Sequence, residues 1–146
     1  MVTVTQTIHI DAPVEDVFAY LDDPHNHVEV TPSLASVKNV ERLENGGKRL
    51  DHTFRMAGVE IGGELVEKHR SENEVMLFDM RGNLEGEIEL RFEAEDDGTR
   101  FSYTARYDLP GKVLSVAAEP FVRRYNEREL KTTLENVKTR LELAEA

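Results

Sequence analysis

The sequence contains no cysteine and no long apolar run, and its basic residues are outnumbered by acidic ones. Without cysteine the chain cannot form a disulfide scaffold, a thiolate metal site or a cysteine nucleophile. No apolar stretch approaches the roughly 20 residues that a membrane-spanning helix needs. The N-terminal MVTVTQTIHI has neither the basic nor the apolar segment of a secretion signal. We therefore expect a soluble protein of the cytoplasm with no integral membrane segment.

The excess of negative over positive charge restricts the possible partners. The chain has 18 Lys+Arg against 29 Asp+Glu, a net charge of -11. Such a surface repels the phosphates of nucleic acids and the headgroups of anionic lipids, so we expect no nucleic-acid partner. The acidic residues are spread through every segment. This pattern is typical of proteins that stay soluble in high salt and suggests a halophilic source, with an ordinary acidic protein as the alternative.

The chain begins with one strand and two short helices. Residues 3–10 alternate between polar and apolar side chains, which predicts a strand. Pro13 then starts a helix with apolar residues at helical spacing, and Pro24 ends it because the residue before a proline is pushed out of the helical conformation. A second short helix is predicted over residues 25–31.

The middle of the chain predicts antiparallel strands joined by turns. Six stretches with strand patterns are separated by glycine-, asparagine- and aspartate-rich turns. They cover residues 35–44, 48–56, 59–69, 74–81, 84–94 and 101–109. The fifth stretch is the clearest, because apolar residues and glycine alternate there with charged residues. The sequence therefore predicts a single α+β domain over residues 1–146, in which a sheet with one charged face needs a cover on the other.

That cover is predicted to be one long helix over residues 110–146. Leu130, Leu134, Val137 and Leu141 form a single apolar stripe at helical spacing. Pro120 interrupts the helix near its start, where it either kinks the helix or begins a new one.

The orientation of the first half of this helix is left open by the pattern. If the helix is continuous, Arg123, Asn126 and Glu127 face the sheet and must pair with each other, with a strand residue or with a ligand, because unpaired buried charge is costly. If Pro120 kinks it, the aromatic residues Phe121 and Tyr125 turn inward instead.

Three stretches of the chain resemble the START-like superfamily, also called SRPBCC. They are residues 8–23 (IHIDAPVEDVFAYLDD), residues 82–100 with their Phe-Glu and Asp-Gly-Thr-Arg, and residues 134–142 (LENVKTRLE). The resemblance implies a helix-grip fold, in which a seven-stranded antiparallel sheet wraps around a long C-terminal helix and two short helices connect strands 1 and 2. It also implies an apolar ligand between sheet and helix. The superfamily includes lipid carriers, quinone-binding proteins and polyketide cyclase/dehydrases, so the fold alone does not separate binders from enzymes.

A few polar residues on predicted apolar faces are candidates for chemistry. His52 shares a strand face with Leu50 and Phe54, where a neutral imidazole can act as a general base or bind a ligand; the alternative is a core histidine bonded to the backbone or water. Tyr103 and Tyr107 share the inward face of the last strand and either hydrogen-bond a ligand or simply line the core. The histidines lack metal-ligand spacing, so we expect no metal, and nothing calls for a cofactor.

These residues lead to three functional hypotheses. The first is a carrier of a hydrophobic small molecule such as a lipid, isoprenoid or quinone-like compound. The second is a cyclase/dehydratase-type enzyme in which His52 or Glu127 removes a proton and Tyr103, Tyr107 or Arg123 steadies the enolate. The third is an interaction module or homodimer that uses Phe121 and Tyr125. The predicted pocket residues are Leu50, His52, Phe54, Met56, Ile61, Leu65, Ile88, Leu90, Phe92, Phe101, Tyr103, Tyr107, Arg123, Leu130 and Leu134.

Overall fold

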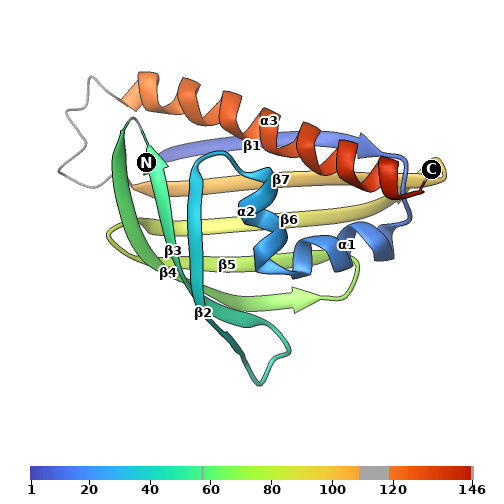
Figure 1. Cartoon of the computed structure of the whole chain (residues 1–146), viewed down its shortest axis with the longest axis horizontal. Helices are drawn as coiled ribbons and strands as arrows, with labels where there is room; N and C mark the ends of the chain where they lie inside the picture. The colour runs from blue at the N-terminus through green and yellow to red at the C-terminus, as the bar shows by residue number, and fades with distance from the viewer. Residues whose placement is uncertain (57, 109–118, 146) are drawn as a thin grey trace.

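In the computed structural model, one antiparallel sheet carries all three helices on the same side (Figure 1). The structure describes residues 1–56, 58–108 and 119–145. The long helix α3 runs beside β1 along one margin of the sheet, and the short helices α1 and α2 lie over its middle. The predicted α+β helix-grip arrangement is confirmed.

The sheet has seven strands in the order β1-β7-β6-β5-β4-β3-β2, and every neighbouring pair is antiparallel. The strands are β1 (Val2–Ile10), β2 (Leu34–Arg42), β3 (Lys48–Met56), β4 (Val59–Ser71), β5 (Val75–Gly82), β6 (Glu85–Glu95) and β7 (Gly98–Asp108). The first strand in the sequence, β1, therefore pairs with the last one, β7.

Proline and aspartate residues mark the starts of the two short helices. α1 (Val14–Asp22) follows Pro13, and α2 (Pro24–Val30) has proline at its first position, where the missing N–H costs no hydrogen bond. The Asp23 side chain accepts a hydrogen bond from the His25 backbone N–H over 3.0 Å and so caps α2. Val17, Phe18 and Leu21 are the buried face of α1.

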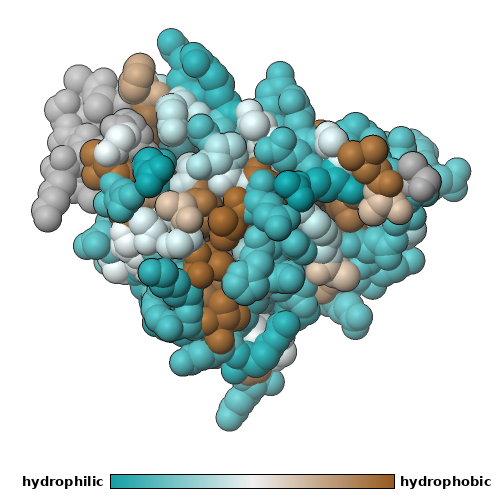
Figure 2. All heavy atoms as spheres, viewed as in Figure 1, coloured by the Kyte–Doolittle hydropathy of each residue, from teal (hydrophilic) through white to brown (hydrophobic). Residues whose placement is uncertain are grey.

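The alternation predicted for β6 and β7 places aromatic side chains of both strands in the core. Phe92 lies opposite Phe101, and their rings stack with centroids 5.2 Å apart. The Phe18 ring of α1 meets Phe92 edge-on at 5.1 Å, which anchors the helix over these strands. Figure 2 shows that hydrophilic residues cover most of the face seen in Figure 1, while a strip of hydrophobic residues reaches the surface across its middle.

Helix α3 (Glu119–Glu145) is one continuous helix with Pro120 in the first turn described. The remaining predicted positions, 110–118 and 146, and the last predicted strand residue, 109, lie outside the described residues. Leu130, Leu134, Val137 and Leu141 are buried, which confirms the apolar stripe.

The first half of α3 matches neither predicted orientation in full. Asn126 is buried as expected of a continuous helix, but Arg123 and Glu127 are exposed, so their predicted inward orientation is wrong. Phe121 is also exposed, and Tyr125 is half-buried. The buried stripe continues back from Leu130 in steps of four residues. Four residues rotate the helix to within about 40° of a full turn, whereas three residues leave it about 60° short, so side chains four residues apart lie closer to one face.

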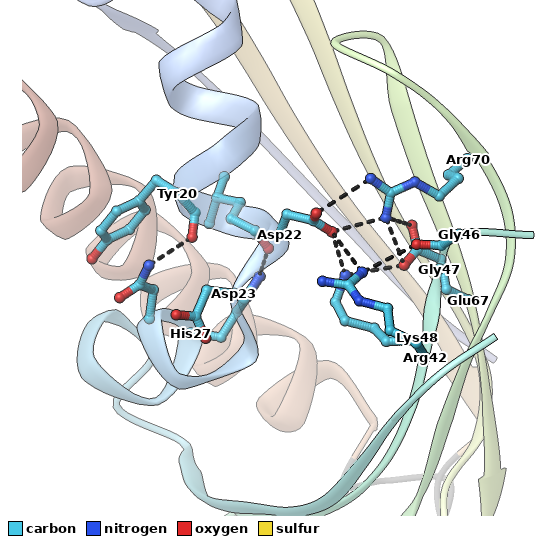
Figure 3. A network of polar contacts seen from close by, with 12 residues as sticks. Tyr20, Asp22, Asp23, His27, Arg42, Gly46, Gly47, Lys48, Glu67 and Arg70 are labelled. Carbon is cyan, nitrogen blue, oxygen red and sulfur yellow. Dashed lines mark hydrogen bonds and ion pairs between the residues drawn. The ribbon is translucent and has the colours of Figure 1, made fainter.

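A buried network of charges ties α1 to the sheet (Figure 3). Lys48 of β3, only 2% exposed, donates to Asp22 over 2.8 Å and to Glu67 over 3.0 Å, and Glu67 of β4 is 0% exposed. Arg70 donates to Asp22 over 2.9 Å. A Cβ at position 47 would lie only 2.9 Å from the Glu67 side chain. Because Gly47 has no Cβ, the turn before β3 leaves room for the buried carboxylate.

The network keeps Asp22 charged. Burial by itself would raise the pKa of Asp22, but hydrogen bonds from Arg70 and Lys48 outweigh it and lower that pKa to about 2. Two cations therefore face two carboxylates in a region shielded from water, and removing one member leaves a charge without its partner.

Among the described residues, no helix is both long enough and apolar enough to cross a bilayer.

We predict that Lys48→Met lowers the free energy of unfolding by about 3–5 kcal/mol, because the Glu67 carboxylate loses its closest buried cation. Urea denaturation of the purified variant measures this loss. The double variant Lys48→Met with Glu67→Leu should recover at least about half of it, because both members of the buried pair are gone. A single variant within about 1 kcal/mol of wild type would show that the network does not stabilise the fold.

Candidate functional site

Two adjacent cavities lie between the sheet and the helices. The larger, which we call cavity 1, holds about 60 Å³ and lies under α3; the smaller, cavity 2, holds about 40 Å³ and lies under α2. Four residues border both: Thr31, Phe54, Ile88 and Tyr103. As they stand, each cavity has room for a few water molecules at most.

Cavity 1 is built from one face of α3 and the inward face of the sheet. Asn126, Glu129, Leu130 and Thr133 stand at i, i+3, i+4 and i+7 and so share a helix face. The full lining is Val4, Thr31, Ser33, Phe54, Met80, Leu84, Ile88, Tyr103, Ala105, Tyr107, Asn126, Glu129, Leu130 and Thr133. Strand alternation explains why Tyr103, Ala105 and Tyr107 all enter it from β7.

Three polar atoms of cavity 1 have no hydrogen-bond partner among the described residues. They are the Tyr107 hydroxyl, Asn126 Nδ2 and Glu129 Oε2. Buried polar groups are almost always hydrogen-bonded, because leaving one unpaired costs about 1–3 kcal/mol. An unpaired group that faces a cavity therefore marks a place where an ordered water molecule or a ligand supplies the missing hydrogen bond.

Both tyrosines of the cavity keep their protons at neutral pH. Burial raises the pKa of Tyr103 to about 12. Burial, and to a smaller extent the neighbouring Tyr103, also raises the pKa of Tyr107. Each hydroxyl can therefore donate a hydrogen bond to a bound molecule.

Cavity 2 is the more apolar of the two. Its lining is Pro24, His27, Thr31, Leu34, Val37, Lys48, Leu50, Phe54, Leu65, Phe78, Ile88, Leu90 and Tyr103. The half-buried His27 has Nε2 only 2.7 Å from the Leu21 carbonyl oxygen, and burial lowers its pKa, so a neutral ring donates to that oxygen. Lys48 is held by Asp22 and Glu67 (Figure 3). These two polar side chains of the wall are thus already occupied by the protein.

His52 is buried as predicted, but it borders neither cavity. It is 2% exposed, lies 4.7 Å from the Phe54 ring between centroids, and has no hydrogen-bond partner for either ring nitrogen among the described residues. Gly63 stands opposite it on β4, and a Cβ there would lie 3.3 Å from His52 Nε2. The ring fills the space that a side chain would take, beside a surface hollow also bordered by Gly62 and Gly82.

The structure brings together about half of the residues predicted for the pocket. Those that border a cavity are Leu50, Phe54, Leu65, Ile88, Leu90, Tyr103, Tyr107 and Leu130. Ile61, Phe92, Phe101 and Leu134 are buried in the core and border neither cavity. Arg123 is exposed and pairs with Glu119, and Glu127 is exposed. The side chain of Met56 lies outside the described part of the structure.

The list of pocket residues missed Glu129 and Thr133, and it omitted Asn126, which the pattern of a continuous helix placed toward the sheet; all three border cavity 1 from α3. A signal for two of them was present, because steps of four back from Leu134 and Val137 reach Asn126 and Thr133. It also missed Thr31 and Ser33, which enter from the segment between α2 and β2. No local pattern marks those positions. In the described ranges, no three His, Asp or Glu side chains come together as a metal site requires.

Comparison with known proteins gives a family and a set of structural relatives. The chain matches the sequence model of the family described as polyketide cyclase / dehydrase and lipid transport over residues 1–142. No curated protein matches it in sequence.

Solved structures share the fold at low sequence identity. The protein TTHA0849 of Thermus thermophilus has a TM-score of 0.86 and 20% identity, covering 99% of both chains. A START superfamily protein of Mycobacterium smegmatis has a TM-score of 0.79 and 14% identity, covering 97% of this chain and 98% of its own. The di-domain ARO/CYC StfQ from the steffimycin biosynthetic pathway has a TM-score of 0.77 and 15% identity, covering 98% of this chain and 51% of its own.

We predict that His52 makes the protein less stable in mild acid. Burial lowers the pKa of His52 from 6.5 to about 4, so between these values the unfolded chain binds a proton that the folded protein does not. Its contribution is therefore fully present above pH 6.5 and is lost as the pH falls toward 4. At pH 5 the loss is about 2 kcal/mol.

Urea denaturation at pH 7.5 and pH 5 tests this. The variant His52→Phe should lose about 2 kcal/mol less than wild type between the two pH values. His25→Phe, at an exposed position of α2, is the matched control and should behave as wild type. Equal losses in wild type and His52→Phe would contradict the prediction.

Proposed function

The chain belongs to the polyketide cyclase / dehydrase and lipid transport family, and we propose that it binds a hydrophobic small molecule between the sheet and α3. The observation that carries the proposal is cavity 1, a partly open space between the sheet and α3 with a mainly apolar lining and a few unpaired polar atoms. Small-molecule sites typically combine these two features, because apolar walls supply affinity and a few polar groups fix orientation.

The apolar part of the site extends into cavity 2. Leu50, Leu65 and Leu90 border it without any polar side-chain atom to satisfy. A molecule that spans both cavities would lie against apolar side chains along most of its length, and removing that surface from water supplies about 25 cal/mol per Å².

Admission of such a molecule requires side chains to move. The two cavities are only about 60 and 40 Å³, and Phe54 and Tyr103 stand at the boundary between them. Changes of side-chain rotamer on binding are common even where the backbone stays still. We propose that Phe54 and Tyr103 shift when the ligand enters and join the two spaces.

A second candidate function is cyclase/dehydratase-type catalysis, favoured by the presence of an acid and a carboxylate in one cavity. Glu129 can take a proton from the carbon next to a carbonyl while the Tyr107 hydroxyl donates to the resulting enolate oxygen. In a dehydration, the proton on Glu129 then passes to the departing hydroxyl, which leaves as water as the double bond forms. This assigns the base to Glu129 rather than to His52 or Glu127, since neither borders the cavity.

An interaction role through α3 has less support. Phe121 is 70% exposed, but Tyr125 beside it is half-buried. A single exposed apolar side chain is ordinary on protein surfaces, so Phe121 alone does not define an interface.

Filling cavity 1 tests the binding proposal. Ala105 borders it from β7, opposite Ile88. We predict that Ala105→Met weakens the binding of the neutral apolar dye Nile red at least about tenfold, because the longer side chain takes the space of the ligand. Ala94→Met, at an exposed position of β6, is the matched control and should bind as wild type. Fluorescence titration measures both, and equal binding by Ala105→Met and wild type would contradict the proposal.

Mass spectrometry of the protein purified without detergent gives an independent test of the same proposal. We expect an apolar compound at close to one molecule per chain, and its identity would name the ligand class directly. Loss of that compound from Ala105→Met but not from Ala94→Met would locate it in cavity 1.

Catalysis is tested with 4-hydroxy-4-phenylbutan-2-one, whose loss of water gives a conjugated enone that absorbs in the near ultraviolet. If the protein is an enzyme of this kind, it should accelerate enone formation and Glu129→Gln should lower the rate at least about a hundredfold, the usual contribution of a general base. A wild-type rate equal to that of buffer would leave binding as the function.

A further inference from the structure

We infer that the molecule bound in cavity 1 presents a neutral hydroxyl group to Tyr107, Asn126 and Glu129. The inference rests on the proposed binding function and specifies the polar end of the ligand. Two features of cavity 1 support it: the polar atoms that have no hydrogen-bond partner, and the charge of the residues around them.

The three residues border the same cavity. Tyr107 is 3% exposed and Asn126 is 8% exposed, so neither side chain can satisfy its polar atoms with bulk water. Asn126 and Glu129 are three residues apart on α3 and therefore lie on one face of the helix. Tyr107 enters the same cavity from β7.

The three unpaired atoms require a ligand group that both donates and accepts hydrogen bonds. Asn126 Nδ2 and the Tyr107 hydroxyl can donate, whereas a Glu129 carboxylate oxygen can only accept. A hydroxyl group gives one hydrogen bond and receives two, so its hydrogen-bonding capacity matches the two donors and the one acceptor left unpaired in the cavity. A ketone would leave Glu129 Oε2 unpaired, and an ammonium group would leave Asn126 Nδ2 unpaired.

The charge of the cavity opposes an anionic ligand. No lysine, arginine or histidine is found among the described residues that border cavity 1, and Glu129 belongs to no ion pair within the described part of the chain. The negative charge of Glu129 is also felt by its neighbour Tyr125, whose pKa is raised by burial first and by the Glu129 carboxylate second. A carboxylate headgroup such as that of a fatty acid would meet a like charge with no cation to offset it.

Apolar walls surround this polar corner. Met80, Leu84 and Ile88 border the same cavity from β5, β6 and the turn between them. A compact hydrocarbon or aromatic body with one hydroxyl at its end therefore matches both parts of the cavity.

Three molecules with the same ring system separate the possibilities: naphthalene, 2-naphthol and 2-naphthoate. Their affinities are measured at pH 7 by displacement of Nile red from the whole protein. We expect 2-naphthol to bind at least about tenfold more tightly than either of the others, because only it both donates and accepts at the polar corner.

Two variants and one control assign the preference to the named residues. In Glu129→Gln the negative charge is removed while the shape is kept, so the affinity for 2-naphthoate should rise and the advantage of 2-naphthol over it should shrink. In Asn126→Leu the advantage of 2-naphthol over naphthalene should shrink several-fold. Glu127→Gln makes the same chemical change as the first variant at an exposed position and should leave all three affinities unchanged.

The outcomes distinguish this inference from the function on which it rests. Equal binding of 2-naphthol and naphthalene, tighter binding of 2-naphthoate, or displacement of bound Nile red by none of the three would overturn the hydroxyl inference alone. Failure of wild-type protein to bind Nile red at all would overturn the proposed function and this inference with it.

Discussion

The structure depends on covering one face of a broad sheet with few helices. Seven strands spaced about 4.8 Å apart span roughly 30 Å, whereas a helix with its side chains is about 10–12 Å wide. Helix α3, with 27 residues, is long enough to run the length of the strands, but a single helix is too narrow to cover all of them. It lies beside β1 rather than over the centre of the sheet. The short helices α1 and α2 cover the middle (Figure 1). The two cavities lie in the space between the sheet and these helices.

The short helices are fixed by charge as well as by apolar contacts. Phe18 packs edge-on against Phe92, and Asp22 at the end of α1 binds Lys48 and Arg70 (Figure 3). A buried ion network contributes little net stability compared with apolar packing, but its members are strongly interdependent and geometrically specific. Because Lys48 also borders cavity 2, the contacts that hold α1 in place help to shape the floor of the proposed binding site.

The unpaired polar atoms of cavity 1 are a feature that close packing does not explain. Tyr107 and Asn126 are buried without partners among the described residues, in a domain where the buried charges of Lys48 and Glu67 are paired with each other. Such groups are commonly found where an ordered water molecule or a ligand supplies the missing hydrogen bonds. The proposed hydroxyl-bearing ligand would convert the unsatisfied groups of Tyr107, Asn126 and Glu129 into a closed set of hydrogen bonds.

The amino-acid sequence by itself determined the elements and their order. The alternation of β6 and β7, the prolines at positions 13 and 24 and the stripe from Leu130 to Leu141 are local signals, because strand and helix periodicity and proline geometry act over a few residues. Only the tertiary structure decided which inward residues meet a cavity. Periodicity states which face a side chain occupies, but whether the space above it is filled depends on residues from distant elements. Phe92 and Phe101 are covered by Phe18 and each other, whereas Tyr107 borders the same open space as Asn126 and Glu129. The rotation of α3 was decided in the same way, because contact with the sheet placed Asn126 inward and Arg123 outward.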